Sequence, residues 1–211
     1  MKISTSILNA ENRLECIKKL NNSTTNYIHI DVMDGKFVED TQINTIEKIT
    51  TLANTSDKQL DIHLMVENPL EYIQKLDNKN IKYIIFHLEI QEDIEMLIQE
   101  IKAKGYLPGI AINPETNIEK LIPYLNQIDL ILIMSVKPGR GGQKFIPTTV
   151  DKIAKLKKII QENKLNILIE VDGGINDQTI KDVKNIDIAV AGSYIIKSPD
   201  YNKAIKKLLN N

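Results

Sequence analysis

Short apolar segments alternate along the whole chain with segments whose apolar residues recur at helical spacing. The apolar segments predict eight strands, at Lys2–Leu8, Tyr27–Val32, Gln59–Leu64, Lys82–His87, Leu107–Ile112, Leu130–Ser135, Asn166–Asp172 and Ile188–Ala191. The clearest helices are predicted over Gln91–Lys104, Val150–Asn163 and Tyr201–Leu209. Gly105 follows the first of these helices and supplies a typical C-terminal stop.

Strands that alternate with helices imply parallel pairing through right-handed crossovers. Eight such units, with no linker or repeat between them, predict an α/β protein with a (β/α)8 TIM barrel as a single domain over residues 1–211. The alternative is an open, doubly wound sheet. Polar residues at the C-terminal ends of successive strands favour the barrel, and no dinucleotide-binding fingerprint follows the first strand.

Composition narrows the class of protein. The chain has 27 basic and 28 acidic residues and no block of like charge, which argues against a nucleic-acid or membrane-surface protein. A single cysteine, Cys16, excludes an internal disulfide and a cysteine metal cage. The start of the chain lacks the apolar run of a signal peptide, and the longest aliphatic run, Leu130 to Met134, is too short to span a bilayer. We therefore expect a cytoplasmic protein.

Candidate chemistry begins in the segment Ile28 to Gly35. The strand period of two places His29, Asp31 and Met33 on one face. An imidazole and a carboxylate side by side at a strand end are suited to holding a metal ion, although a His–Asp hydrogen bond within a core is the plain alternative.

Two further strands end in similar residues. The segment Leu60 to Met65 contains His63, and Ile169 to Gly174 ends with Asp172 before two glycines. In a barrel these strand ends converge at one mouth, so His29, Asp31, His63 and Asp172 are expected to meet. Two imidazoles and two carboxylates suit a divalent ion such as Zn, Fe(II), Mn or Co.

Glycines suggest a phosphate site. Gly173 and Gly174 leave the seventh strand into an expected helix, and Gly192 and Ser193 leave the eighth. Loops at these two positions form the usual phosphate site of a barrel enzyme, although glycines also serve simple tight turns. The loop Gly139-Arg140-Gly141-Gly142 after the sixth strand is interpreted as a mobile cover, whose backbone amides could reach the phosphate, with Arg140 as a further candidate contact.

Together these segments resemble the ribulose-phosphate 3-epimerase family. The matching motifs run in family order over nearly the whole chain: Ser4 to Leu8, His29 to Gly35, Asp61 to Met65, Leu132 to Val136, Pro138 to Gln143, Glu170 to Gly174 and Val190 to Ser193. The resemblance implies a (β/α)8 barrel that interconverts D-ribulose 5-phosphate and D-xylulose 5-phosphate in the pentose phosphate pathway. It also implies one divalent metal per subunit and a homo-oligomer, either a dimer or a hexamer.

The resemblance also assigns roles to residues. It implies metal ligation by His29, Asp31, His63 and Asp172, with Asp31 and Asp172 as the catalytic acid–base pair. Substrate contacts are implied for Ser6, His63, Gly139, Arg140, Gly141, Gly142, Gly173, Gly174, Gly192 and Ser193. Inverting carbon 3 through an enediolate needs an acid–base group on each face of that carbon, which explains two carboxylates. Met33, Met65 and Met134 are expected to form an apolar wall.

The chain departs from the family pattern in a few places. Thr5 stands where the family usually has proline, Arg140 where it has an aromatic residue, and Glu39 to Asn44 replaces a Pro-Asn segment. These changes bear on rate, substrate preference and assembly. His87 and Glu89, after the fourth strand, are expected to lie behind the site or to have ordinary core or surface roles.

Three other functions compete. The same chemistry could act on a hexulose phosphate such as allulose 6-phosphate, although Gly173-Gly174 and Met134 to Val136 look more like the pentulose enzymes. A related lyase usually needs an Asp-x-Lys-x-x-Asp arrangement after a strand, and none follows a predicted strand here, since Lys36 follows Asp34-Gly35 in the wrong register. A non-catalytic sugar-phosphate binder is the third alternative, and the intact set of four candidate ligands argues against it.

Overall fold

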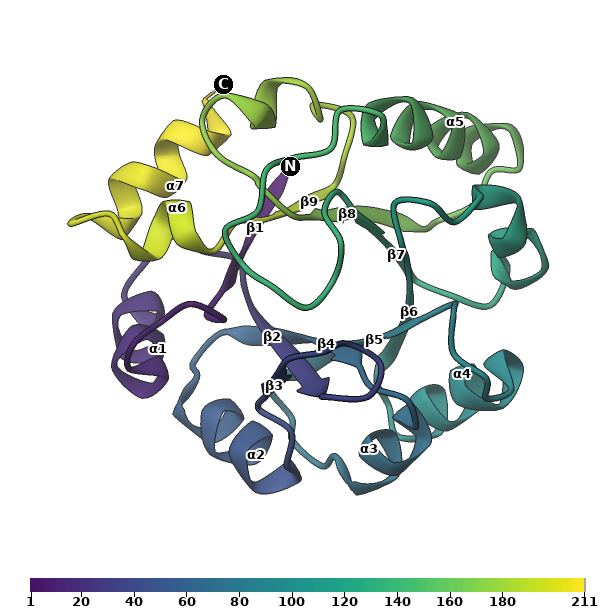
Figure 1. The fold of residues 1–211 in the computed structure, drawn as a ribbon, viewed down its shortest axis with the longest axis horizontal. Helices are drawn as coiled ribbons and strands as arrows, with labels where there is room; N and C mark the ends of the chain where they lie inside the picture. Colours follow the sequence, from purple (N-terminus) through teal and green to yellow (C-terminus); the bar gives the residue numbers. More distant parts are fainter. Residues whose placement is uncertain (211) are drawn as a thin grey trace.

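The computed structural model describes residues 1–210, and its strands form a closed barrel surrounded by helices (Figure 1). The eight parallel strands are β1 Lys2–Ser6, β2 Tyr27–Asp34, β4 Gln59–Met65, β5 Ile81–His87, β6 Leu107–Ile112, β7 Leu130–Met134, β8 Leu168–Asp172 and β9 Ile188–Val190. Because β1 pairs with both β9 and β2, the ring is closed and the open-sheet alternative is wrong. The predicted (β/α)8 class is confirmed, and each predicted strand lies within two residues of an observed one at both ends.

Helices cover the outside of the barrel. They are α1 Arg13–Asn21, α2 Ile46–Thr55, α3 Pro69–Lys75, α4 Ile94–Ala103, α5 Thr149–Glu162 and α7 Tyr201–Leu209. The three predicted helices are α4, α5 and α7. Helix α4 begins later than Gln91 because the Asp93 side chain accepts a hydrogen bond from the Met96 amide and caps the helix there.

Three connections depart from regular α-helix. After β6 comes a 3-10 helix, η1 Ile118–Tyr124, which contains Pro123, and after β9 comes the short α6 Ser193–Ile196. The helix expected directly after β8 is only the 3-10 turn η2 Thr179–Lys181, so that expectation is wrong. The reason is local: the Asn176 side chain accepts hydrogen bonds from the amides of Gln178 and Thr179, which offers the backbone an alternative to α-helix.

Alternation along the strands separates two apolar regions. Every second residue points outward and packs between sheet and helices, as Ile28, Ile62 and Phe86 do. The others fill the barrel, including Ile85, Leu132 and Ile188. Within the described residues, no helix combines the length and apolar character needed to span a lipid bilayer. The assignment of residues 1–211 to a single domain stays a prediction.

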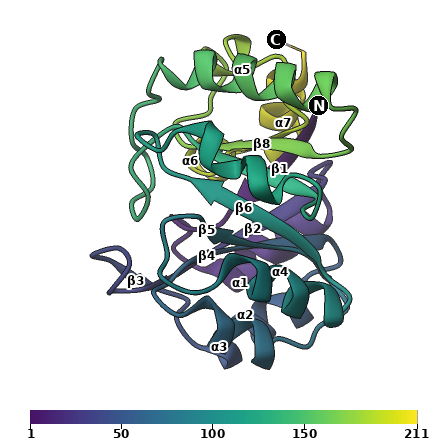
Figure 2. The same ribbon diagram turned by 90° about the vertical axis from the view of Figure 1, so that its right-hand side faces the viewer.

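The loops after β2 and β7 extend from the same end of the barrel (Figure 2). The first contains β3 Thr41–Gln42, which pairs antiparallel with the end of β2. This end is the C-terminal end of the parallel strands, where barrel enzymes carry their active sites.

Candidate active site

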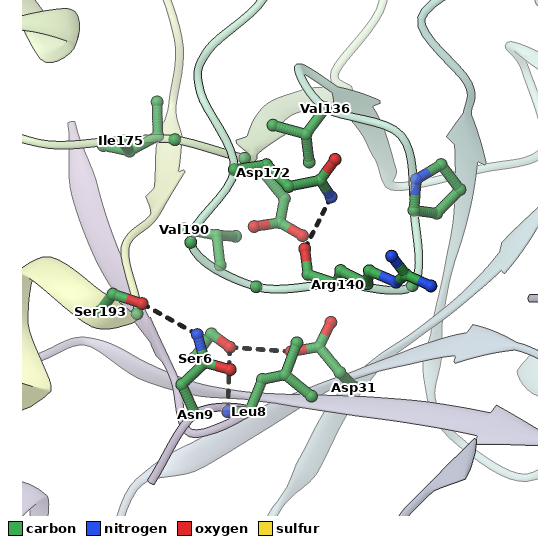
Figure 3. Close-up of a pocket in the computed structure, with 18 of the residues that line it drawn as sticks. Ser6, Leu8, Asn9, Asp31, Val136, Arg140, Asp172, Ile175, Val190 and Ser193 are labelled. Carbon is green, nitrogen blue, oxygen red and sulfur yellow. Dashed lines mark hydrogen bonds between the residues drawn. The ribbon is translucent and has the colours of Figure 1, made fainter. Parts of the chain in front are cut away.

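A pocket opens at the C-terminal end of the barrel, and two carboxylates face each other across it (Figure 3). Asp31 comes from β2 and Asp172 from the end of β8. The Ser6 hydroxyl donates a 2.8 Å hydrogen bond to Asp31 Oδ2 and holds that carboxylate in place. The two acidic groups therefore approach one cavity from opposite sides.

The four side chains expected to meet do meet. His29, Asp31, His63 and Asp172 each offer one ligand atom, and these atoms lie within 4.8 Å of one another. Strand register explains the meeting, since Asp31 on β2 is the direct neighbour of His63 on β4. His29 Nε2 and His63 Nδ1 both lie 3.3 Å from the same oxygen, Asp31 Oδ1. Two imidazoles and two carboxylates at this spacing fit a divalent cation.

Burial and neighbouring charges shift the pKa values of Asp31 and Asp172 in opposite directions. Burial alone would raise the pKa of Asp31, but His29 and His63 lower it well below its usual range. Burial raises the pKa of Asp172 to about 7, with the negative charges of Asp31 and Asp61 adding to the effect and His29 opposing it. A carboxyl group with a pKa near 7 is suited to exchanging protons at neutral pH.

The pKa values of His29 and His63 are also shifted in opposite directions. Burial would lower the pKa of His29, but the carboxylates of Asp61 and Asp31 raise it well above the usual value. Burial lowers the pKa of His63 to about 4, and repulsion from His87 and His29 adds to this. A divalent cation at this site would compete with the proton on His29, so binding of the cation would release protons.

Glycines from the loops after β8 and β9 also line the pocket. Gly174 has a φ of +65°, and a Cβ atom there would collide with the Phe145 backbone, so this turn requires glycine. The loops that carry Gly173, Gly174, Gly192 and Ser193 meet at the pocket wall. The Asn9 amide nitrogen donates to Ser193 Oγ over 3.0 Å (Figure 3). Because glycine has no side chain, the backbone at these positions can approach an anion closely.

The loop after β7 lies over the centre of the barrel in Figure 1, and its residues Pro138 to Gln143 line the pocket. The Gln143 amide donates to the carbonyls of Lys137 and Arg140, at 2.7 Å each, and so braces the loop from within. Gly139 packs so closely on Val38 that a Cβ atom would lie 2.9 Å from its side chain. The Arg140 backbone lines the pocket, but its guanidinium points away from Ser193 and contacts Glu39 Oε2 at 3.1 Å (Figure 3).

A family model for the ribulose-phosphate 3 epimerase family matches residues 2–196. The ribulose-phosphate 3-epimerase of Helicobacter pylori strain J99 is 36% identical over 215 residues, which cover 100% of this chain and 97% of that protein. The ribulose-phosphate 3-epimerase of Bacillus subtilis strain 168 is 35% identical over 216 residues, which cover 99% of this chain and 98% of that protein. This chain belongs to the ribulose-phosphate 3-epimerase family.

Solved structures of other barrels resemble this epimerase-family chain in fold. A 3-hexulose-6-phosphate synthase from Salmonella typhimurium has a TM-score of 0.66 at 17% identity and covers 100% of this chain and 97% of its own. KGPDC from Streptococcus mutans has a TM-score of 0.70 at 11% identity, and the match covers 99% of this chain and 95% of the KGPDC chain. At these identities the likeness supports the barrel fold alone.

Most residues that the epimerase resemblance assigned to the substrate line this one pocket. They are Ser6, Gly139, Arg140, Gly141, Gly142, Gly173, Gly174, Gly192 and Ser193. The three methionines Met33, Met65 and Met134 line it as well. His63 does not; it is fully buried and contacts Asp31 from behind. His87 lies where a supporting residue was expected, with its Nε2 2.9 Å from His63 Nε2.

Sequence reasoning missed three polar side chains beneath the epimerase-family site. Asp61 Oδ1 lies 2.7 Å from His29 Nδ1, and Asp61 Oδ2 accepts a 2.7 Å hydrogen bond from the Ser4 hydroxyl. Glu170 is fully buried nearby, and burial, with the adjacent Asp61, raises its pKa well above the usual range. The signal was present: each acidic residue stands two positions before a site residue, His63 or Asp172, on the same strand face.

Proposed function

We propose that this chain inverts carbon 3 of a ketopentose phosphate and so interconverts D-ribulose 5-phosphate and D-xylulose 5-phosphate. The observation that carries the proposal is the placement of Asp31 and Asp172 on opposite sides of one pocket (Figure 3). Inversion next to a carbonyl removes a proton from one face of the carbon and returns one to the other. One carboxylate cannot serve both faces, whereas two opposed carboxylates can.

The two carboxylates exchange roles with the direction of reaction. One removes the proton from carbon 3 to give an enediolate, and the other, in its acid form, delivers a proton to the opposite face. The geometry supports this division, because Asp31 and Asp172 line the same pocket from opposite sides. The hydrogen bond from Ser6 keeps Asp31 directed into the pocket.

The residues that would hold a divalent cation are His29, Asp31, His63 and Asp172. Their donor set suits Zn, Fe(II), Mn or Co, one ion per subunit. When bound, the ion would act as a Lewis acid that stabilises the negative charge of the enediolate. The burial of the two histidines supports tight ligation, because water does not reach them to compete.

The remaining residues of the pocket would bind and enclose the substrate. The glycine backbones at 173–174, together with Gly192 and Ser193, would hold the phosphate, whose binding energy fixes carbon 3 between the carboxylates. The loop containing Gly139, Arg140, Gly141 and Gly142 would cover the substrate and exclude water. The weakly polar side chains of Met33, Met65 and Met134 would surround the reacting carbons.

An epimerase assay on the purified protein tests this function. The protein is stripped of metal with a chelator, reloaded separately with Zn, Fe(II), Mn or Co, and supplied with ribulose 5-phosphate or with allulose 6-phosphate. We expect turnover of the five-carbon substrate that disappears on stripping and returns on reloading. A strong preference for the six-carbon substrate would assign the hexulose alternative, and sugar-phosphate binding without turnover would indicate a binder. We also propose that the protein is a homo-oligomer, a dimer or a hexamer, and the mass of the purified protein in solution would give the subunit number. We propose a cytoplasmic location as well.

A further inference from the structure

All three histidines of the chain lie in one cluster of contacts. His29, His63 and His87 are each fully buried, and the ring centroids of neighbouring members lie 5.4 Å and 5.0 Å apart. A neutral imidazole carries its proton on one of two nitrogens, and the hydrogen bond at the other nitrogen decides which. The contacts behind the site therefore decide which nitrogens present a lone pair to the cation.

A chain of hydrogen bonds runs from Glu89 through His87 to His63, and the contacts of Glu89 determine which atoms in it donate. Glu89 Oε1 accepts a 2.8 Å hydrogen bond from the Asn113 amide and a short one from the Thr116 hydroxyl. Glu89 Oε2 lies 3.1 Å from His87 Nδ1. Because an ionised carboxylate only accepts hydrogen bonds, His87 must carry its proton on Nδ1.

The tautomer of His87 in turn determines the tautomer of His63. With its proton on Nδ1, neutral His87 has a lone pair on Nε2, which lies 2.9 Å from His63 Nε2. One of two nitrogens in such contact must donate, so His63 carries its proton on Nε2. The lone pair of His63 is then on Nδ1, which faces Asp31 Oδ1 at 3.3 Å. Because the ionised Asp31 carboxylate also only accepts, this pair of acceptors requires a cation held by both atoms.

We propose that Glu89 is a positioning residue that acts through His87 to keep the unprotonated Nδ1 of His63 directed at the metal site. The inference rests on the metal site of the proposed function. Packing supports it, because the Phe37 ring lies against His87 with centroids 4.8 Å apart and limits rotation of that ring. His29 reaches the same Asp31 oxygen with its Nε2, at 3.3 Å, while its Nδ1 lies 2.7 Å from Asp61 Oδ1.

The first test reads the tautomers directly. With only three histidines in the chain, the side-chain nitrogens are assignable by long-range 1H–15N NMR of the zinc-loaded protein. We expect a proton on Nδ1 of His87 and on Nε2 of His63. A proton on Nε2 of His87 overturns the proposal without any variant.

The second test reverses the direction of the chain with Glu89→Gln. The amide oxygen takes the place of Oε1 toward Asn113 and Thr116, so the amide NH2 faces His87. His87 must then accept at Nδ1 and donate from Nε2, which moves the proton of His63 to its metal-facing nitrogen. With wild type and variant both metal-free, we expect the His87 tautomer of the variant to be the reverse of the wild type's. The affinity for Zn²⁺ alone, measured by competition with a chelating dye, should fall by about 10- to 100-fold.

The matched control is Glu92→Gln, the same chemical change three residues along the chain. Glu92 accepts a 3.1 Å hydrogen bond from the Leu70 amide rather than from a histidine. We expect it to keep the wild-type zinc affinity. Unchanged tautomers and unchanged affinity in Glu89→Gln, or an equal loss in both variants, would show that Glu89 only braces the loop at Asn113. Failure of the wild type to bind zinc would instead contradict the proposed metal site, and the tautomers would still be measurable.

Discussion

Replacing Asp172 with asparagine is expected to stop inversion at carbon 3 while leaving one half of the reaction in place. Asparagine keeps the size of the side chain and an oxygen that can face a cation, but it neither accepts nor delivers the proton. Asp31 stays positioned, because its contacts run to Ser6, His29 and His63 and not to Asp172. It can still remove a proton from the face of carbon 3 that it reaches, and return a proton to that same face.

The magnitude follows from the loss of one acid–base group. A positioned acid–base residue contributes about 10²–10⁴-fold to the rate, or about 3–5 kcal/mol of barrier. We therefore expect Asp172→Asn to lower the epimerisation rate by at least about 10²-fold at saturating metal. The metal content of each preparation is measured, because neutral asparagine is also a weaker ligand than a carboxylate.

The assay that separates the two half-reactions is hydrogen exchange in deuterated water. Each epimer is incubated separately with enzyme, and deuterium at carbon 3 and inversion are followed by NMR. Asp172→Asn should exchange one epimer without inverting it, and Asp31→Asn should exchange the other. Asp151→Asn, an exposed site on α5, is the matched control and should keep both activities. Inversion by Asp172→Asn within about tenfold of wild type would refute two-carboxylate catalysis, and so would exchange of the same epimer by both variants.

Two further predictions concern the loops around the pocket. Arg140→Ala should raise the Michaelis constant severalfold, because it removes the contact with Glu39 that holds the covering loop, and should leave the metal content unchanged. An unchanged Michaelis constant would show that this contact does not support substrate binding. Gly174→Ala should lower the melting temperature more than Gly105→Ala does, because both have positive φ, but only the Cβ at 174 collides with backbone, that of Phe145. Each change carries a backbone cost of about 1–2 kcal/mol, so equal losses of stability would show that the contact with Phe145 relaxes freely.

The sequence alone was sufficient for the barrel and for the four proposed ligands. Alternation with a period of two is a local property, and it places His29 with Asp31 on the inner face whatever their neighbours are. Parallel strands joined by helices then bring their C-terminal ends to one side, which is why residues as distant as Asp31 and Asp172 were expected together. The motifs that carry the family resemblance fall on these same strand ends.

Local pattern was insufficient for the connections. A helix was expected after Gly173 and Gly174, but hydrogen bonds that the Asn176 side chain accepts from the Gln178 and Thr179 amides hold the segment as a 3-10 turn. The difference between the two conformations is the balance of a few hydrogen bonds. Periodicity of apolar residues does not measure that balance.

Tertiary structure alone decided which atoms of the supporting polar groups come into contact. Strand register brings Asp61 and Ser4 behind His29, and it brings His87 behind His63, across strands whose pairing no single strand encodes. The packing of two loops places the guanidinium of Arg140 against Glu39, 101 residues away in the chain. Hydrogen bonds act over about 3 Å between specific atoms, so their partners are defined only when the barrel has closed and every strand has its final neighbour.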